Sequence, residues 1–107
     1  MKIEIKDTGE VHVWGGDVWT VTIGGKRRRV VVWQGSGFYG ASSDCNVACE
    51  SLSLREAIAM AVSPEVDFVD QRDDSSEIRR AVRDLTRCLE VRAAMRGAKL
   101  PKLRSAK

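Results

Sequence analysis

The sequence predicts an α+β fold in which an antiparallel sheet comes first and two helices follow. Short runs of branched and aromatic residues alternate with polar residues through the first third of the chain, a pattern typical of strands. The pairs Gly15-Gly16 and Gly24-Gly25 separate successive runs, and glycine accepts the positive φ of a tight hairpin turn. Farther along, apolar residues recur at helical spacing. We therefore expect a meander of three to four strands, packed by one short helix and one longer C-terminal helix.

The expected strands cover residues 2–6, 11–14, 18–23 and 27–33. Residues 34–50 are rich in glycine and serine, so we expect mostly loop there, with room for a short strand near 47–49. If Gly15-Gly16 forms a strict two-residue turn, His12 and Trp14 join the core face, and one extra loop residue moves both to the other face. The sequence leaves this register open.

A two-residue turn at Gly24-Gly25 would place Trp19 opposite Val30 and Thr20 opposite Arg29. Side chains on a strand alternate between the two faces, so this pairing assigns each residue to one face. The expected core face carries Trp19, Val21, Ile23, Val30 and Val32. The opposite face carries Thr20, Thr22, Arg27, Arg29 and Trp33.

The first helix begins at a capping box, Ser53 to Glu56, in which each side chain can bond to the other residue's backbone amide. Its expected apolar stripe consists of Leu54, Ala57, Ile58, Ala61 and Val62. Ser63-Pro64 ends it. A second helix is expected over about 75–96, with Gly97 placed to end it. Its apolar positions are Ile78, Val82, Leu85 and Leu89.

The 107 residues predict one domain over 1–97 and a basic, flexible tail over 98–107. No run is apolar and long enough for a secretory signal or a membrane span, so we expect a cytoplasmic protein without membrane contact. The three cysteines are expected to be reduced thiols. Cys45, Cys49, Cys88 and His12 could nominally surround zinc, but without a second closely spaced pair we expect neither a metal nor a cofactor.

The glycine triplet Gly35, Gly37 and Gly40 matches the G-x-G-x-x-G pattern of phosphate-binding loops. In a dinucleotide-binding unit the glycines follow a strand and open a helix, whereas here no helical periodicity appears before Leu54. We therefore expect a loop. A single histidine and no nucleophile–base spacing predict a protein that is not an enzyme. The aspartates at 67, 70, 73 and 74 lack the glycine and glutamate of a calcium loop.

Charge is distributed unevenly along the chain. Residues 1–74 carry 8 basic and 12 acidic side chains, whereas residues 75–107 carry 10 basic and 3 acidic ones. Two basic surfaces follow from the expected elements: a sheet face that presents Arg27, Arg29 and Trp33, and a helix line of Arg79, Arg83 and Arg87. Pairing with the acidic 65–77 segment would neutralise part of this charge. Either surface suits carboxylate or phosphate groups.

Two resemblances bear on function. Strands followed by a helix, from 11–14 through Ser53–Val62, are similar in topology to the later part of double-stranded-RNA-binding domains and to the three-stranded DNA-binding domains of integrases. The compact, unevenly charged chain, with Gly24–Trp33 and Ile78–Leu89 carrying that charge, resembles small phage accessory proteins of the anti-CRISPR inhibitor type. The second resemblance implies a stoichiometric inhibitor that occupies a site on a host nucleoprotein complex.

The sequence thus predicts a non-catalytic binding protein that engages a protein or nucleoprotein partner by surface complementarity. Arginines would meet carboxylates, and an exposed tryptophan would serve as the anchor. The alternative is direct binding of DNA or RNA through the two basic surfaces. A further option is a homodimer in which two chains share the apolar stripe of the C-terminal helix.

Overall fold

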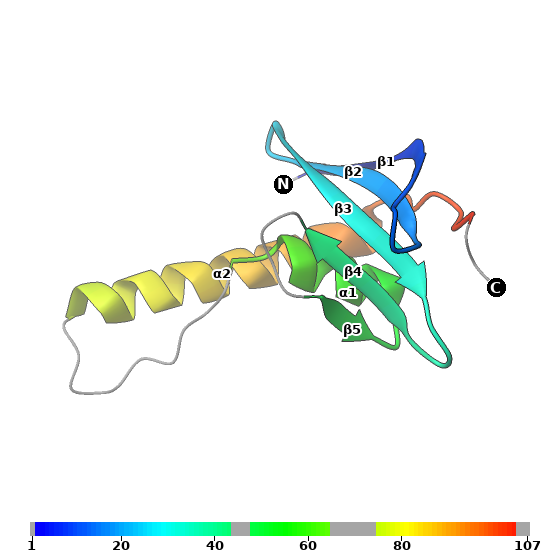
Figure 1. Cartoon of the computed structure of the whole chain (residues 1–107). Helices are drawn as coiled ribbons and strands as arrows, with labels where there is room; N and C mark the ends of the chain where they lie inside the picture. Colours follow the sequence, from blue (N-terminus) through cyan, green and yellow to red (C-terminus); the bar gives the residue numbers. More distant parts are fainter. Residues whose placement is uncertain (1, 44–47, 65–74, 105–107) are drawn as a thin grey trace.

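The computed structural model describes residues 2–43, 48–64 and 75–104 and contains one sheet and two helices (Figure 1). The sheet is antiparallel, with strand order β1-β2-β3-β4-β5. Its strands are β1 (Ile3–Val11), β2 (Asp17–Ile23), β3 (Lys26–Gln34), β4 (Tyr39–Ser43) and β5 (Cys49–Ser51). The helices are α1 (Leu54–Val62) and α2 (Ser75–Gly97). The predicted α+β meander is confirmed, with five strands instead of three or four.

Strand β1 extends the first expected strand, residues 2–6, as far as Val11, whereas residues 12–14 of the second expected strand lie in a loop. Asp7 pairs with Trp19 and Val11 pairs with Asp17, so β1 carries two more residues than β2 between these pairs. Gly9, with φ of 83°, lies in this bulge. A bulge inserts residues without ending the strand, which is why the break in alternation at this point was misread as a boundary.

The hairpin at Gly24-Gly25 forms with the predicted register. Trp19 lies opposite Val30 and Thr20 opposite Arg29, and both glycines have positive φ, 55° and 82°. This is the backbone that a two-residue turn of the primed type requires. The predicted core residues of β2 and β3 are all buried: Trp19, Val21, Ile23, Val30 and Val32.

Strands β4 and β5 occupy part of the stretch expected to be loop. Val32 pairs with Ala41, and Ala41 also pairs with Cys49. Glycine and serine do form strands where the neighbouring strand supplies the hydrogen bonds, because β propensity mainly reflects packing against neighbours. The expectation of mostly loop over 34–50 was therefore wrong at residues 39–43, while the short strand allowed near 47–49 begins at Cys49 as β5.

Helix α1 confirms its predicted cap and its predicted stripe. The Ser53 hydroxyl accepts a hydrogen bond from the Glu56 amide at 3.4 Å. The Glu56 carboxylate does not complete the capping box, since it pairs with Arg92 of α2 at 2.8 Å. Ala57, Ile58, Ala61 and Val62 are buried and Leu54 packs at their edge, so α1 covers the sheet and forms the centre of the core.

Helix α2 packs on the core only through its C-terminal third. Val91 and Met95 are buried in the core, while the earlier part of the helix extends past the sheet as a single rod (Figure 1). The guanidinium of Arg55 donates to the carbonyl oxygens of Met95 (2.6 Å) and Ala98. A cation at this end satisfies terminal carbonyls and complements the helix dipole, so it fixes where α2 ends.

Residues 98–104, the start of the expected basic tail, run along the body of the protein. Ala98 is buried, and Leu100 and Leu103 pack against the core. The chain then reaches the start of β2, where Arg104 donates its backbone N–H to the buried Asp17 carboxylate at 2.6 Å. Residues 105–107 lie outside the described part.

Candidate interaction surfaces

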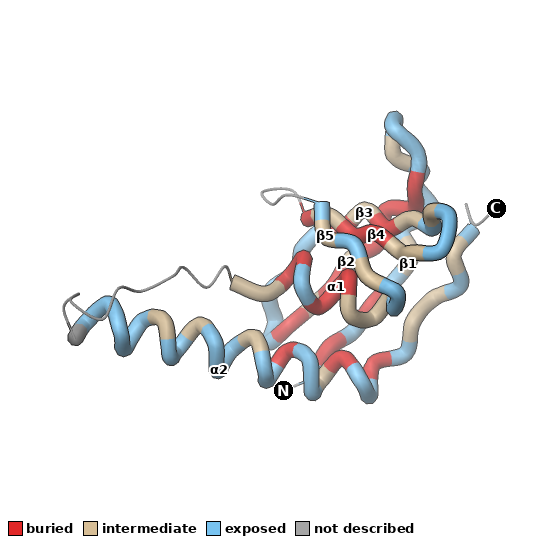
Figure 2. Tube along the Cα trace, turned by 90° about the horizontal axis from the view of Figure 1, so that it is seen from below, coloured by how far each residue is buried: buried red, intermediate tan, exposed pale blue. Residues whose placement is uncertain are grey.

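Among the described residues, one face of the sheet carries no helix, and we call it the outer face. Both helices lie on the opposite side of the sheet (Figure 2). The register places Arg27 and Arg29 of β3 opposite Thr22 and Thr20 of β2 on the outer face, as the sequence predicted. Trp33 lies on the same face of β3, half-buried. Three of the six predicted site residues therefore share the outer face, with Arg27 and Trp33 near opposite ends of β3 and Arg29 between them.

The β1–β2 loop, residues 12–16, projects from the outer side of the sheet (Figure 2). The His12 N–H donates to the Gly16 carbonyl at 3.0 Å, and the Gly15 N–H donates to the His12 carbonyl at 2.8 Å. The backbone N–H of Trp14 donates to Nδ1 of the His12 side chain at 3.2 Å. The loop is thus closed by its own hydrogen bonds, and neither of the two registers left open by the sequence describes it.

This loop holds the most exposed large apolar side chains among the described residues. Trp14 is 89% exposed and Val13 is 88% exposed. Of the three tryptophans, Trp19 is buried and Trp33 half-buried, so Trp14 is the one that faces solvent. The sequence did not indicate Trp14 as a site residue, because its position depended on a register that the glycine pair alone could not specify.

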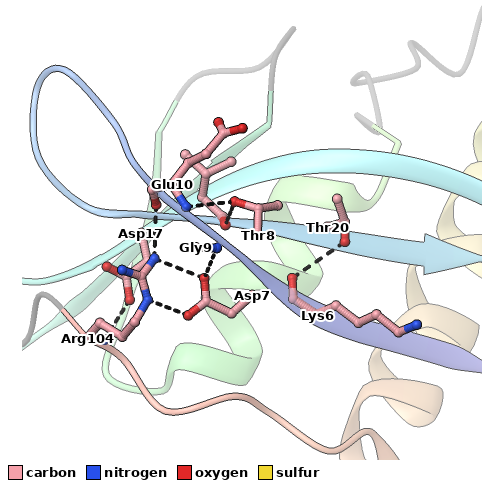
Figure 3. A network of polar contacts seen from close by, with 9 residues as sticks. Lys6, Asp7, Thr8, Gly9, Glu10, Asp17, Thr20 and Arg104 are labelled. Atoms are coloured by element: carbon pink, nitrogen blue, oxygen red, sulfur yellow. Dashed lines mark hydrogen bonds and ion pairs between the residues drawn. The ribbon is translucent and has the colours of Figure 1, made fainter.

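The base of this hairpin is held by Arg104 from the far end of the chain (Figure 3). Its guanidinium donates two hydrogen bonds to the Asp7 carboxylate, and Nη2 also donates to the Glu10 carbonyl at 3.0 Å. The Gly9 N–H donates to Asp7 as well. The Arg104 guanidinium, followed by the Gly9 amide, lowers the pKa of Asp7. This network ties the C-terminal segment to the bulge from which the loop extends.

The glycine triplet has a structural explanation that differs at each position. Gly35 lies in the β3–β4 hairpin, where its N–H donates to the Phe38 carbonyl at 2.9 Å. A Cβ there would come within 2.2 Å of the Phe38 ring, and a Cβ at Gly40 within 2.1 Å of the Trp33 indole. Gly37 has φ of 79°. Gly35 and Gly40 thus make room for two rings and Gly37 forms a turn; Gly35 and Gly37 lie in the expected loop, whereas Gly40 lies in β4.

The predicted arginine line lies on α2, away from the outer face. Arg79, Arg83 and Arg87 are exposed, and Arg87 lies 3.9 Å from Glu90 of the same helix. Because α2 packs against the other side of the sheet, this line and the β3 arginines belong to separate surfaces (Figure 1). The two basic regions therefore do not form one continuous patch.

Carboxylates accompany several basic side chains on these surfaces. Arg29 lies 3.0 Å from Glu10, and Lys2 lies 3.4 Å from Glu4. For Arg27, no ion pair is found within the described residues. The outer face consequently presents both signs of charge beside apolar groups.

Two other kinds of candidate site are a groove beside β1 and a group of metal-binding side chains. A groove of about 730 Å³ lies between β1 and the C-terminal end of α2; it is lined by isoleucines of β1, by alanines and a glycine at the end of α2, and by Lys2, Glu4, Lys6 and Lys99. Within residues 2–43, 48–64 and 75–104, no three histidine, cysteine, aspartate or glutamate side chains are grouped to hold a metal ion. Cys45 and the aspartates at 67, 70, 73 and 74 lie outside the described residues.

No helix in the described part of the chain is long and apolar enough to cross a membrane. Comparisons of the chain with protein-family models, with curated proteins and with solved structures found no significant match. Function is therefore argued from the surfaces themselves.

Proposed function

We propose that this protein is a non-catalytic binding protein that docks onto a protein surface, alone or within a nucleoprotein complex, through the β1–β2 loop and the outer face. The observation that carries the proposal is Trp14, 89% exposed on a loop that its own hydrogen bonds close. Binding of this indole in an apolar pocket of a partner would remove its surface from water, which is favourable in free energy. Tryptophan is also enriched among the residues that dominate interface energetics.

The charges around this loop support a protein partner over a polyphosphate. Glu10, at the end of β1 that leads into the loop, pairs with Arg29. A carboxylate among the arginines weakens attraction to a phosphate backbone, whereas protein interfaces match charges of both signs. Arg27, which has no ion pair within the described residues, is available to a partner's carboxylate.

An inhibitor of this kind would work by occupying a surface that its partner needs. Trp14 and Val13 would fill an apolar pocket, and the polar outer face would form the rim that excludes water. The mechanism requires no cofactor and no bond-making step. The narrower expectation of an anti-CRISPR inhibitor stays a prediction, which the identity of the captured partner would test.

The test compares Trp14→Ala with a matched variant, Leu52→Ala. Leu52 is also an exposed apolar residue, 84% exposed, but it lies between β5 and α1 and outside the proposed surface. Tagged protein is incubated with a lysate of a plausible host, with and without nuclease, and the recovered partner is purified and titrated against both variants. We expect stoichiometric capture that survives nuclease, affinity reduced at least about tenfold by Trp14→Ala, and no change with Leu52→Ala. Equal affinity of the two variants would refute the proposal.

A second candidate function is direct binding of DNA or RNA. It is favoured by Arg27, Arg79 and Arg83, which have no ion pair within the described residues. Phosphate contacts release counterions, so affinity should fall steeply between about 50 and 200 mM salt, and Arg27→Glu with Arg29→Glu should abolish binding to the sheet face. Affinity that is measurable but insensitive to salt would count against this candidate.

A further inference from the structure

The N-terminal two thirds of α2, residues 75–90, form a projecting helical segment that we call the α2 arm. The molecule measures 48 Å along its longest axis against 27 and 21 Å along the others, and the arm extends past the sheet (Figures 1 and 2). At 16 residues the arm only just exceeds the length of about 12–15 residues below which isolated helices are marginal in water, and helices in proteins depend mostly on packing of an apolar face. An arm of this length therefore calls for a packing partner.

The arm has such an apolar face, and the part of the chain that the structure describes leaves it exposed. Its members share one stripe and a spacing of four, three and four residues. They are Ile78 (42% exposed), Val82 (59%), Leu85 (51%) and Leu89 (57%). This spacing is that of the contact positions of a two-helix coiled coil.

The stripe points away from the body of the protein. At about 100° per residue, the mean direction of the stripe lies roughly 130° around the helix from that of Val91 and Met95, which face the core. Cys88 hydrogen-bonds to the Pro64 carbonyl and therefore marks the side of the arm that faces the end of α1. A second helix can consequently lie along the stripe without meeting the sheet.

We propose that a second copy of this chain covers the stripe, so that two α2 arms pack as a short antiparallel coiled coil. In the antiparallel arrangement Ile78 of each copy faces Leu89 of the other, and Val82 faces Leu85. All four apolar layers are then matched, and the contact is closed by a two-fold axis. The arm is thus complementary to a second copy of itself, because both copies present the same apolar positions over the same length.

Charge selects the antiparallel arrangement over the parallel one. The next two positions of the stripe are Arg92, which pairs with Glu56 of α1 at 2.8 Å, and Arg96. A parallel pair would set Arg96 against Arg96 of the other copy, and like charges that face each other are destabilising. In the antiparallel pair, Arg92 lies beside the first turn of the other α2, around position 75.

The proposed interface is small, so we expect only a modest affinity between the two copies. Four apolar layers bury less than the 1,200 Å² or so of a standard stable interface, so we expect a dissociation constant in the micromolar range. Self-association should raise the helical content of the chain as concentration rises, because pairing stabilises the arm. The dimer would also carry two Trp14 loops. Only the use of these loops for binding a partner depends on the proposed function.

The first test measures mass against concentration by analytical ultracentrifugation, together with helical content by circular dichroism. We expect wild type to pass from 11.9 kDa to twice that mass over the micromolar range. Leu85→Glu should weaken association at least about tenfold, because it would bury a carboxylate in the contact. Leu52→Glu is the matched control and should associate as wild type does. A wild-type chain that stays monomeric up to millimolar concentration, or a Leu85→Glu chain that associates normally, would overturn the proposal.

The second test determines orientation by disulfide trapping in a chain whose three cysteines are replaced by alanine. In the antiparallel pair the two copies of residue 78 are about 16 Å apart along the helix, beyond the reach of a disulfide. Ile78→Cys chains alone should therefore not cross-link, whereas a mixture of Ile78→Cys and Leu89→Cys chains should cross-link efficiently. Rapid cross-linking of Ile78→Cys chains alone would exclude the antiparallel arrangement. Failure here leaves the Trp14 experiment unaffected, so the two proposals can be judged separately.

Discussion

Replacing Gly40 by alanine tests whether the Trp33 indole packs flat across its cross-strand neighbour. Gly40 lies directly opposite Trp33, and a Cβ at Gly40 would lie 2.1, 2.3 and 2.4 Å from Cε2, Cζ2 and Nε1 of the indole. Favourable contact between heavy atoms begins near 3.5 Å, so the ring must retreat by more than about 1 Å. Overpacking of this kind costs about 1–3 kcal/mol.

Part of that cost is offset, because glycine within a strand is itself about 0.5–1 kcal/mol less stable than alanine. We expect Gly40→Ala to lower the free energy of unfolding by a net ~0.5–2 kcal/mol, measured by urea denaturation with circular dichroism. Gly97→Ala is the matched control: no atom lies within 4 Å of its added Cβ, so it should be neutral or stabilising by up to about 1 kcal/mol.

A double-mutant cycle isolates the ring contact. In a Trp33→Ala background the added methyl group meets no indole, and Gly40→Ala should become stabilising by about 0.5–1 kcal/mol. If Gly40→Ala costs the same with and without Trp33, the indole does not decide the tolerance of this position and the reasoning is refuted.

Two further predictions concern contacts that link distant parts of the chain. The Arg104 guanidinium lowers the pKa of Asp7, so this carboxylate stabilises the fold above its unfolded pKa of about 3.9 and loses that contribution as pH falls through its lower folded pKa. The difference in urea midpoint between wild type and Asp7→Asn should therefore be present at pH 7 and shrink below about pH 4; a difference independent of pH would contradict this assignment. Arg55→Met should lower the free energy of unfolding by about 1–3 kcal/mol, because it removes the guanidinium donor from the Ala98 and Met95 carbonyls, of which only Met95 keeps a second donor, the Ala98 N–H. Arg96→Met removes a nearby exposed arginine and should change the free energy of unfolding by less than about 0.5 kcal/mol.

Local features of the sequence sufficed for much of the fold. The turn at Gly24-Gly25 specifies the β2–β3 register residue by residue, because two residues of positive φ leave one way to pair the strands. The cap at Ser53 and the stop at Ser63-Pro64 bound α1 for similar reasons. Both signals act within a few residues, so they can be read without the rest of the molecule.

Features that depend on a partner strand or on distant residues were missed. Strand β4 forms where loop was expected, because pairing with β3 satisfies the backbone of a segment rich in glycine and serine, which have little strand propensity of their own. Arg104 meets Asp7 across almost the whole chain, and no spacing rule connects two such positions. Val91 and Met95 of α2 lie in the core. The helical periodicity of the sequence instead indicated the apolar positions nearer the N-terminus of the helix, which are Ile78, Val82, Leu85 and Leu89.

The sequence by itself determined which residues of β3 face outward, since strand alternation and a two-residue turn require no long-range information. It also determined that Ile78, Val82, Leu85 and Leu89 share one side of a helix. Only the tertiary structure decided that this side faces away from the core and that Trp14 stands in solvent. The reason is physical: periodicity shows that a face is apolar, but what covers that face depends on where the rest of the chain lies.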